Sequence, residues 1–149
     1  PGKRDCGVAY FEGGRLIRAS FVETDGDDVD LTRLVVAFNG GQPIDLLITE
    51  DQQVYARGKG DPNDLFPLAN VVGGIRAVYP AKERVKPLPR VWTGGVPKDV
   101  RHRKLLARLP PEEISVIDAV KVTKAKKHNV VDAVAIGVWV LEQRGFRVR

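Results

Sequence analysis

The sequence predicts an α/β fold in which short strands alternate with helices along a single domain, residues 1–149. Two segments of alternating polarity flank the turn Gly13-Gly14, a pattern typical of a β-hairpin. Residues 43–50 place four apolar side chains within five positions, a run that suits a buried strand and is too short for a helix. A chain of 149 residues is long enough for one such domain with its own core.

The composition is that of a soluble globular protein, since 43% of the residues are hydrophobic and 29% are charged. No run approaches the ~18 apolar residues that a membrane-spanning helix needs, and no signal peptide is visible. The single cysteine, Cys6, excludes an internal disulfide framework and a cysteine-rich zinc site. We therefore expect a protein of the reducing cytosol.

Charge is distributed unevenly along the chain. Residues 1–81 carry 8 Lys and Arg against 12 Asp and Glu, whereas residues 82–149 carry 16 against 7. The net charge of +5 therefore combines an acidic half with a strongly basic half. This arrangement favours a protein that binds a polyanion and holds cations for chemistry. A basic face that serves only solubility is the alternative.

The first elements follow from local patterns. Residues 6–12 and 15–22 are expected to form the two antiparallel strands of the hairpin. A helix is predicted over 29–38 because apolar residues recur there at helical spacing. These residues are Leu31, Leu34, Val35 and Phe38. Residues 39–41, Asn-Gly-Gly, are expected to end this helix before the next strand begins.

Glu50 stands where the predicted apolar strand ends. In open α/β sheets, ligands bind outside the carboxyl ends of the strands. A glutamate at that position is well placed to hold a metal ion. The alternative is a solvated acid at the edge of the sheet.

A second helix is predicted to begin at Asp61-Pro62, with Asp as its N-cap and Pro at its first position. Its expected inward-facing residues are Leu65, Leu68, Ala69 and Val72. Gly73-Gly74 would let this helix pack closely on a neighbour. Residues 84–92 are predicted to form an edge strand, because Pro87 and Pro89 cannot donate to a ladder on both sides.

The basic half begins with a glycine-rich turn at 93–98, which fails the GxxxxGK[ST] spacing of a nucleotide-binding P-loop. A helix is predicted over 97–109. It carries six basic side chains: Lys98, Arg101, His102, Arg103, Lys104 and Arg108. After the break at Pro110-Pro111, a short helix is expected at 112–120 and a basic link at 121–127.

The last predicted helix, 128–141, is apolar nearly all round and must be covered on most sides. Asp132 lies inside it. A buried carboxylate costs several kcal/mol unless it is paired, hydrogen-bonded or bound to metal. The structural alternative is a capping box, with Asn129 as the N-cap and Asp132 three residues later.

The order of these elements resembles that of the ribonuclease H-like nucleases, and most closely that of the RuvC-type Holliday-junction resolvases and their phage-encoded relatives. The residues that carry the resemblance are Pro1-Gly2 with 6–11, Glu50 with Tyr55, 61–65, 92–98 and 128–133. Each motif is moderately specific, and the resemblance rests on their order and spacing together. It implies a ribonuclease H-like mixed sheet flanked by helices, in a protein of the cytoplasm of a bacterial or phage-infected cell.

In this family the first strand ends in Asp-Pro-Gly, and its Asp is a metal ligand. Pro1-Gly2 resembles the end of that motif. We therefore expect the first central strand of the sheet and its Asp to lie immediately before Pro1, so that this chain lacks both.

The resemblance also implies the remaining metal ligands. Glu50 matches the glutamate at the strand end, and Asp132 matches the last acid of the C-terminal helix. The family usually has an acid, occasionally a histidine, three residues before that Asp. Here Asn129 holds that position, and we expect its neighbour His128 to serve instead, because His128 and Asp132 share a helix face. The implied cofactor is a pair of Mg²⁺ ions, with Mn²⁺ as an alternative.

The implied substrate is branched DNA, above all the four-way junction, cut by a homodimer through phosphodiester hydrolysis. Lys86 and Lys98 resemble basic residues near the scissile phosphate, Lys98 as part of the catalytic set, and Tyr55 resembles an aromatic residue that stacks at the junction crossover. The expected DNA-binding residues are Tyr55, Lys59, Lys86, Trp92, Lys98, Arg101, Arg103 and Lys104.

Two other functions fit the same elements. A catalytically silent ribonuclease H-like domain would bind nucleic acid without cutting it. A sugar-kinase-like or actin-like domain shares the early hairpin, but the chain is too short for the two lobes that clamp ATP.

Overall fold

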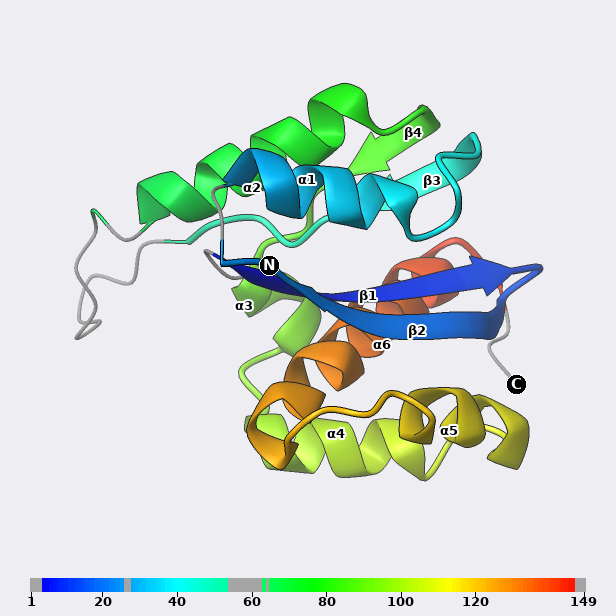
Figure 1. Ribbon diagram of the computed structural model, residues 1–149. Coiled ribbons are helices and arrows are strands. Elements are labelled where there is room, and N and C mark those ends of the chain that lie inside the picture. Colours follow the sequence, from blue (N-terminus) through cyan, green and yellow to red (C-terminus); the bar gives the residue numbers. More distant parts are fainter. Residues whose placement is uncertain (1–3, 26–27, 54–62, 64, 147–149) are drawn as a thin grey trace. The chain divides into compact units, whose positions relative to one another are not determined.

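Figure 1 shows the computed structural model, which describes residues 4–25, 28–53, 63 and 65–146. These residues form a mixed α/β fold, as predicted, with one antiparallel hairpin, one pair of parallel strands and flanking helices. The chain divides into two compact units, Pro1–Cys6 with Val22–Trp92 and Gly7–Phe21 with Thr93–Arg149. That the two units belong to one domain stays a prediction.

The first unit contains the predicted apolar strand, β3 (Ile44–Ile48). It pairs in parallel with β4 (Ala81–Val85), and Ile48 lies opposite Val85. α2 (Leu65–Val78) lies between the two strands in sequence and provides the crossover that a parallel pair requires. The predicted N-cap of this helix, Asp61-Pro62, lies outside the described residues.

The predicted edge strand over 84–92 is wrong beyond its first two residues. β4 ends at Val85, and a short helix, α3 (Pro89–Thr93), follows. Proline cannot donate to a strand ladder, but it fits the first position of a helix, where no N–H donor is needed. Pro89 takes that position, and the helix brings Trp92 back towards the end of β3.

α1 (Asp28–Ala37) packs beside α2 in the first unit (Figure 1). The two helices bury Leu31, Val35, Val71, Val72 and Ile75. The predicted inward positions Leu31, Val35 and Val72 are therefore confirmed. Leu34 in α1 and Ala69 in α2 are exposed instead; for Ala69 the reason is that the buried face of α2 is rotated towards Val71 and Ile75.

Gly74 is the point of close approach between these helices. A Cβ atom added there would lie 2.9 Å from Thr32 Oγ1, whereas Gly73 has no atom within 4 Å of its added Cβ. The prediction of close packing is thus confirmed for Gly74 and wrong for Gly73. Helix α1 ends at Ala37, near the predicted stop, and Tyr79 donates a hydrogen bond of 2.6 Å to Asn39 Oδ1 just beyond it.

The second unit contains most of the predicted hairpin, β1 (Asp5–Glu12) and β2 (Arg15–Glu23). Gly13 and Gly14 both have positive φ angles, 56° and 86°. Two such residues in a two-residue turn match the right-handed twist of the strands that they join. The turn predicted from the Gly-Gly pair is therefore confirmed.

α6 (Lys124–Gln143) packs along β1. A Cβ added to Gly7 would lie 2.0 Å from Asn129 O, and one added to Gly137 would lie 2.4 Å from Phe11 Cε2. Four strand residues span about 13 Å and eight helical residues span about 12 Å, so both contacts stay in step along the two elements. One glycine on each element permits this approach.

The predicted apolar helix at 128–141 is confirmed, but it begins earlier than expected. Lys124 to Lys127 belong to α6, so the predicted basic link at 121–127 is wrong from Lys124 onward. Thr123 occupies the N-cap position, and its carbonyl accepts the N–H groups of Lys126 and Lys127. Lysine and alanine are good helix formers, which explains why the helix extends through this run.

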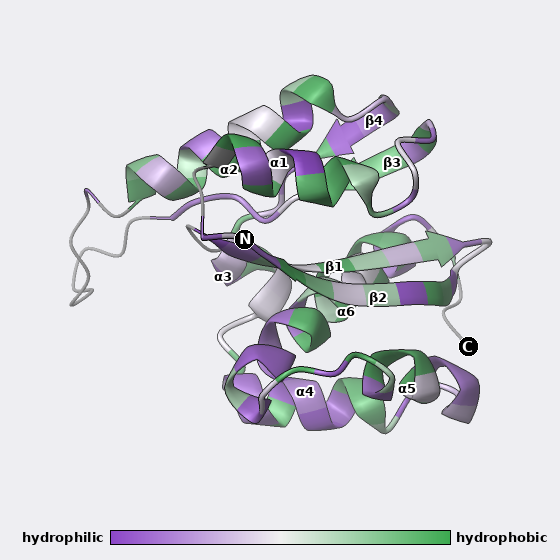
Figure 2. Ribbon diagram, in the orientation of Figure 1, coloured by the Kyte–Doolittle hydropathy of each residue, from purple (hydrophilic) through white to green (hydrophobic). Residues whose placement is uncertain are grey.

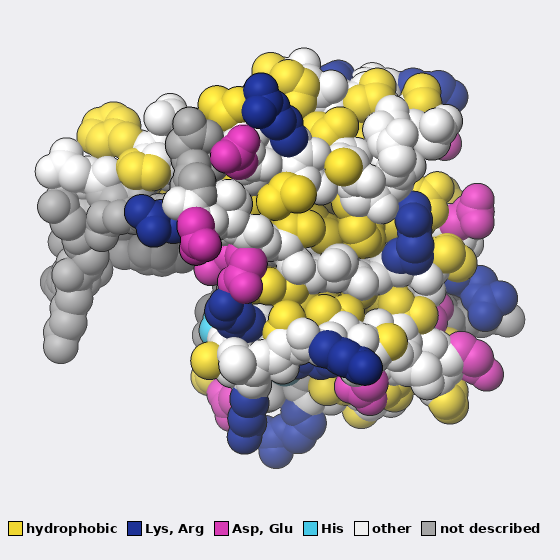
Figure 3. All heavy atoms as spheres, viewed as in Figure 1, with side chains coloured by type: hydrophobic (Ala, Val, Ile, Leu, Met, Phe, Trp, Pro, Cys, Tyr) yellow, Lys and Arg dark blue, Asp and Glu magenta, His cyan; other side chains and the backbone are white. Residues whose placement is uncertain are grey.

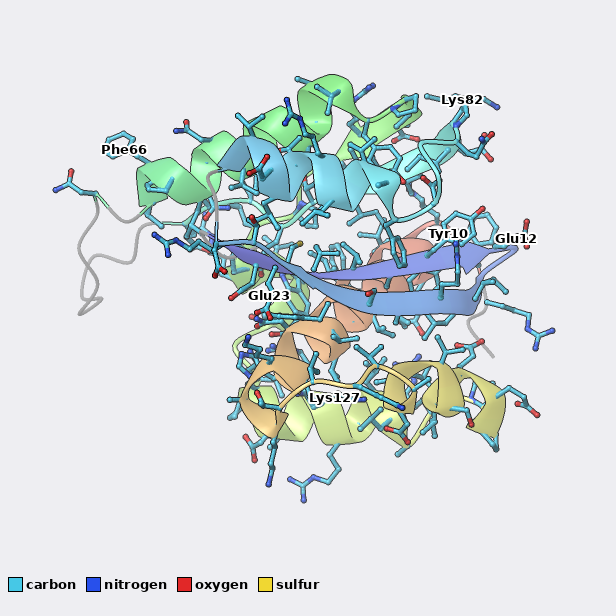
Figure 4. The ribbon with its side chains drawn as sticks, viewed as in Figure 1. Tyr10, Glu12, Glu23, Phe66, Lys82 and Lys127 are labelled. Carbon is cyan, nitrogen blue, oxygen red and sulfur yellow. The ribbon has the colours of Figure 1, made fainter. Side chains whose placement is uncertain are left out.

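α4 (Lys98–Leu106) and α5 (Pro111–Asp118) lie within the predicted helices 97–109 and, apart from Pro111, 112–120. Figure 2 shows α4 as largely hydrophilic, in contrast with the apolar stretch of α6. Lys127 reaches from α6 to the C-terminal end of α5, where its ammonium donates to the carbonyls of Ile117 and Val120 (Figure 4). This lysine therefore satisfies the orphan carbonyls of a helix end.

Candidate functional site

The first polar cluster lies at the carboxyl end of the parallel pair β3–β4. The pairing continues past the strands, because Thr49 donates its backbone N–H to Val85 O at 3.1 Å and Asp51 donates to Pro87 O at 3.0 Å. Glu50 stands between these two bonds. The position predicted for a ligand-binding carboxylate is therefore held by backbone pairing on both sides.

The carboxylate of Glu50 accepts a hydrogen bond from the indole of Trp92, with Nε1 2.9 Å from Oε1. Trp92 is only 7% exposed. Its predicted role in DNA binding stays a prediction, but its observed contact is with Glu50. Sequence reasoning missed this contact because the two residues are 42 positions apart.

Basic side chains stand around the same strand ends. Lys86 Nζ lies 3.0 Å from Asp51 Oδ1, with 43% of the lysine side chain exposed. Arg76 donates to Thr49 Oγ1 at 3.4 Å and to Val85 O at 3.3 Å. Lys86 therefore pairs with Asp51, the residue that follows Glu50 in the sequence, and its side chain remains partly accessible.

The second polar cluster surrounds Asp132 in α6. Lys98 Nζ lies 2.6 Å from Oδ2, whereas Arg101 and His102 both contact Oδ1, at 3.0 and 2.7 Å. An ionised carboxylate only accepts hydrogen bonds, so His102 carries a proton on Nε2. Asp132 is therefore paired, as its burial requires. Because α6 begins at Lys124, Asn129 lies inside the helix and the capping-box alternative is wrong.

Electrostatics keep Asp132 ionised. Burial by itself would raise the pKa of this carboxyl, but the hydrogen bonds from His102, Lys98 and Arg101 outweigh it and hold the pKa below its ordinary value. The carboxylate therefore carries its charge throughout the neutral range. Its three partners differ in accessibility, since the Lys98 side chain is 45% exposed while those of Arg101 and His102 are 17% and 16% exposed.

His102 is the residue that sequence reasoning missed in this cluster. We expected His128 to accompany Asp132, but His128 is exposed, and the histidine in contact with Asp132 comes from α4. A signal existed in the sequence. Lys98, Arg101 and His102 are spaced i, i+3 and i+4, which places them on one face of a helix. The role of His128 as a ligand stays a prediction.

The remaining predicted DNA-binding residues fall in two groups. Arg103 and Lys104 are exposed on α4. Figure 3 shows Lys and Arg side chains gathered over α4 and the start of α6. Tyr55 and Lys59 lie outside the described residues.

Carboxylates are the ligands that Mg²⁺ prefers, and each cluster provides at least one: Glu50 and Asp51 in the first and Asp132 in the second. Within the described part of the chain, no group of three or more His, Cys, Asp or Glu side chains stands together as a metal site. Glu50 belongs to the first unit and Asp132 to the second, so their convergence on shared ions stays a prediction. Asp132 suits a cation by charge, but its oxygens already contact three basic groups.

No protein-family model matches the chain, and neither a curated protein nor a solved structure shows significant similarity to it. Among the helices of the described residues, none has both the length and the apolar character needed to cross a membrane.

Proposed function

We propose that this protein is a magnesium-dependent, structure-selective DNA endonuclease with a ribonuclease H-like fold, which resolves four-way junctions by hydrolysing phosphodiester bonds. The observation that supports it most is the second cluster. There an ionised carboxylate, Asp132, lies within hydrogen-bond distance of Lys98 and Arg101 on a basic helix. Carboxylates that hold cations and basic groups that hold a phosphate are the two components that this chemistry needs.

The bound ions would activate water and offset the charge on the leaving oxygen. Glu50 and Asp132 would hold them, and the basic face of α4 would hold the DNA backbone. Lys98 is the half-exposed partner of Asp132 and contacts Oδ2. When its ammonium turns to a phosphate oxygen, Oδ2 is released. Arg101 and His102 stay in contact with Oδ1 and keep the carboxylate in place.

The same geometry supports a proposed order of events in binding. Three basic partners around one carboxylate oppose the approach of a cation. A DNA phosphate that engages Lys98 removes one of these charges. We therefore expect Asp132 to become available to a cation only when DNA is bound, whereas Glu50, whose partner is the neutral indole of Trp92, can meet a cation without DNA.

The test is cleavage of a synthetic four-way junction by the full-length protein in Mg²⁺. We expect paired nicks in the junction and little cutting of linear duplex. Glu50→Gln and Asp132→Asn should abolish nicking while junction binding remains. Asp45→Asn is the matched control, because Asp45 lies on β3, the strand that leads to Glu50, but its side chain is 86% exposed and pairs with Lys82 at the surface.

A second candidate is the catalytically silent binding module. It is favoured by one observation, the occupation of Asp132 by Lys98, Arg101 and His102. Such a module would bind the junction in the wild type and in both carboxylate variants, and it would cut in none of them.

The proposed nuclease would act as a homodimer, because two-fold symmetry would let two sites cut symmetry-related strands of the junction. Light scattering of the protein with and without a junction would give its mass. A monomer in both states would contradict paired cutting by one assembly.

A further inference from the structure

We propose that Trp92 is a positioning residue for Glu50: its indole N–H fixes one carboxylate oxygen and leaves the other turned towards a bound cation. This inference rests on the proposed nuclease function and deepens it. It also assigns a role to α3, the helix that replaces the expected edge strand.

The backbone around Glu50 is fixed by the segment that follows β4. Beyond the bonds of Thr49 and Asp51 to Val85 and Pro87, the Arg90 N–H lies 3.2 Å from the Gln53 side-chain oxygen. Glu50 therefore lies outside a regular strand yet has little freedom to move. Its side chain remains to be oriented.

α3 supplies that orientation. The helix begins at Pro89, and the Trp92 N–H lies 3.3 Å from Leu88 O, which closes a single turn. This turn carries the indole to Glu50. A buried indole N–H needs an acceptor, and a carboxylate with two oxygens can serve Trp92 and keep one oxygen for another partner.

The charges around the site indicate what that other partner is. Asp51 and Asp132 each face basic side chains. Among the described residues, no Lys, Arg or His forms an ion pair with Glu50, whose hydrogen-bond partner is the neutral indole. Glu50 is thus oriented without being neutralised, and its charge remains available to a divalent cation. A role limited to packing would not need an ionisable acceptor.

The chain contains two tryptophans, Trp92 and Trp139, so its indole N–H groups give two resonances in a nitrogen–proton NMR spectrum. The resonance that is missing from the spectrum of Trp139→Phe belongs to Trp139, and the other belongs to Trp92. Addition of Mg²⁺ alone should shift the Trp92 resonance and leave that of Trp139 unchanged, and Glu50→Gln should abolish the shift. An unchanged Trp92 resonance in the wild type, or an equal shift in Glu50→Gln, would overturn the proposal.

Nicking provides the second readout. Trp92→Phe keeps an aromatic ring and removes the donor, so it should raise the Mg²⁺ concentration for half-maximal nicking by about 10- to 100-fold, as loss of a partner that orients a metal ligand does. Trp139→Phe is the control. Equal Mg²⁺ dependence in the two variants would refute the role of Trp92 and leave the nuclease intact. Absence of nicking in the wild type would refute the nuclease, and the NMR shift would still decide whether Trp92 senses a cation at Glu50.

Discussion

Two carboxyl groups of the second unit show how strongly the surroundings decide the state of a single residue. Asp132 is held ionised by three basic side chains. Glu113 in α5 is only 1% exposed, and among the described residues neither of its oxygens makes a hydrogen bond of good geometry, although the Leu16 backbone lies near enough to interact weakly. Burial raises the pKa of Glu113, and the Leu16 backbone and the charge of Arg15 offset this only in part. Glu113 therefore opposes folding whenever it is ionised.

The burial of Glu113 predicts how the free energy of unfolding depends on pH. The folded protein raises the pKa of Glu113, so folding favours the protonated carboxyl group. The stability that this group contributes is fully present below its pKa in the unfolded chain, about 4.3, and is lost as pH rises through its pKa in the folded protein. Glu113→Gln should remove this dependence on pH, so that the free energy of unfolding of the variant changes less between pH 4 and pH 8 than that of the wild type. Urea unfolding between pH 4 and pH 8 measures it. The control is Glu112→Gln, an exposed neighbour on the same helix, which should have little effect.

At the scale of elements, the second unit depends on how closely β1 and α6 approach each other. Gly7 lies against the α6 backbone at Asn129, and Gly137 lies against the ring of Phe11. Ring atoms can shift, whereas a helix backbone cannot without breaking its own hydrogen bonds. A side chain is therefore tolerated less well at Gly7 than at Gly137.

We predict that Gly7→Ala costs about 1–3 kcal/mol or more, because the added methyl group would overlap Asn129 O and C. Gly137→Ala should cost less. Gly73→Ala is a control of opposite sign, since Gly73 is an exposed helical position with no atom near its added Cβ. It should stabilise the protein by about 0.5–1 kcal/mol through helix propensity. Thermal unfolding ranks the three variants, and similar losses in all of them would contradict the packing argument.

At the scale of the whole molecule, charge separates along the chain and helix α4 concentrates basic side chains. Lys98 and Arg101 turn towards Asp132, while Arg103 and Lys104 face solvent on the same helix. One helix thus offers both a partner for the carboxylate and contacts for a DNA backbone. We therefore predict that loss of Arg103 and Lys104 weakens DNA binding and leaves the carboxylate of Asp132 ionised and paired.

The corresponding prediction concerns salt. Junction affinity should fall steeply as salt rises, and replacing both Arg103 and Lys104 with Gln should reduce the slope of log K against log [salt] by about 2, close to one unit per lost phosphate contact. Fluorescence anisotropy at several salt concentrations gives the slope. Arg33→Gln is the control, because Arg33 is exposed on α1 and pairs with Asp30. An unchanged slope in the double variant would exclude α4 as a DNA contact.

Local patterns determined much of the fold. The Gly-Gly hairpin, the apolar strand before Glu50 and the apolar part of α6 depend on residues close together in sequence, and all three are confirmed. The errors arose where local signals compete. Pro87 and Pro89 are compatible with an edge strand and with a helix start, and the structure has a helix there, which carries the buried Trp92.

What the sequence alone determined is where the two carboxylates lie, Glu50 at a strand end and Asp132 within a long apolar helix. Only the tertiary structure decided what touches them. Trp92 is 42 residues from Glu50, and His102 is 30 residues from Asp132. Periodicity reports which face of a helix is apolar, but it carries no information about which distant side chain completes a hydrogen bond, because that depends on how separate elements pack.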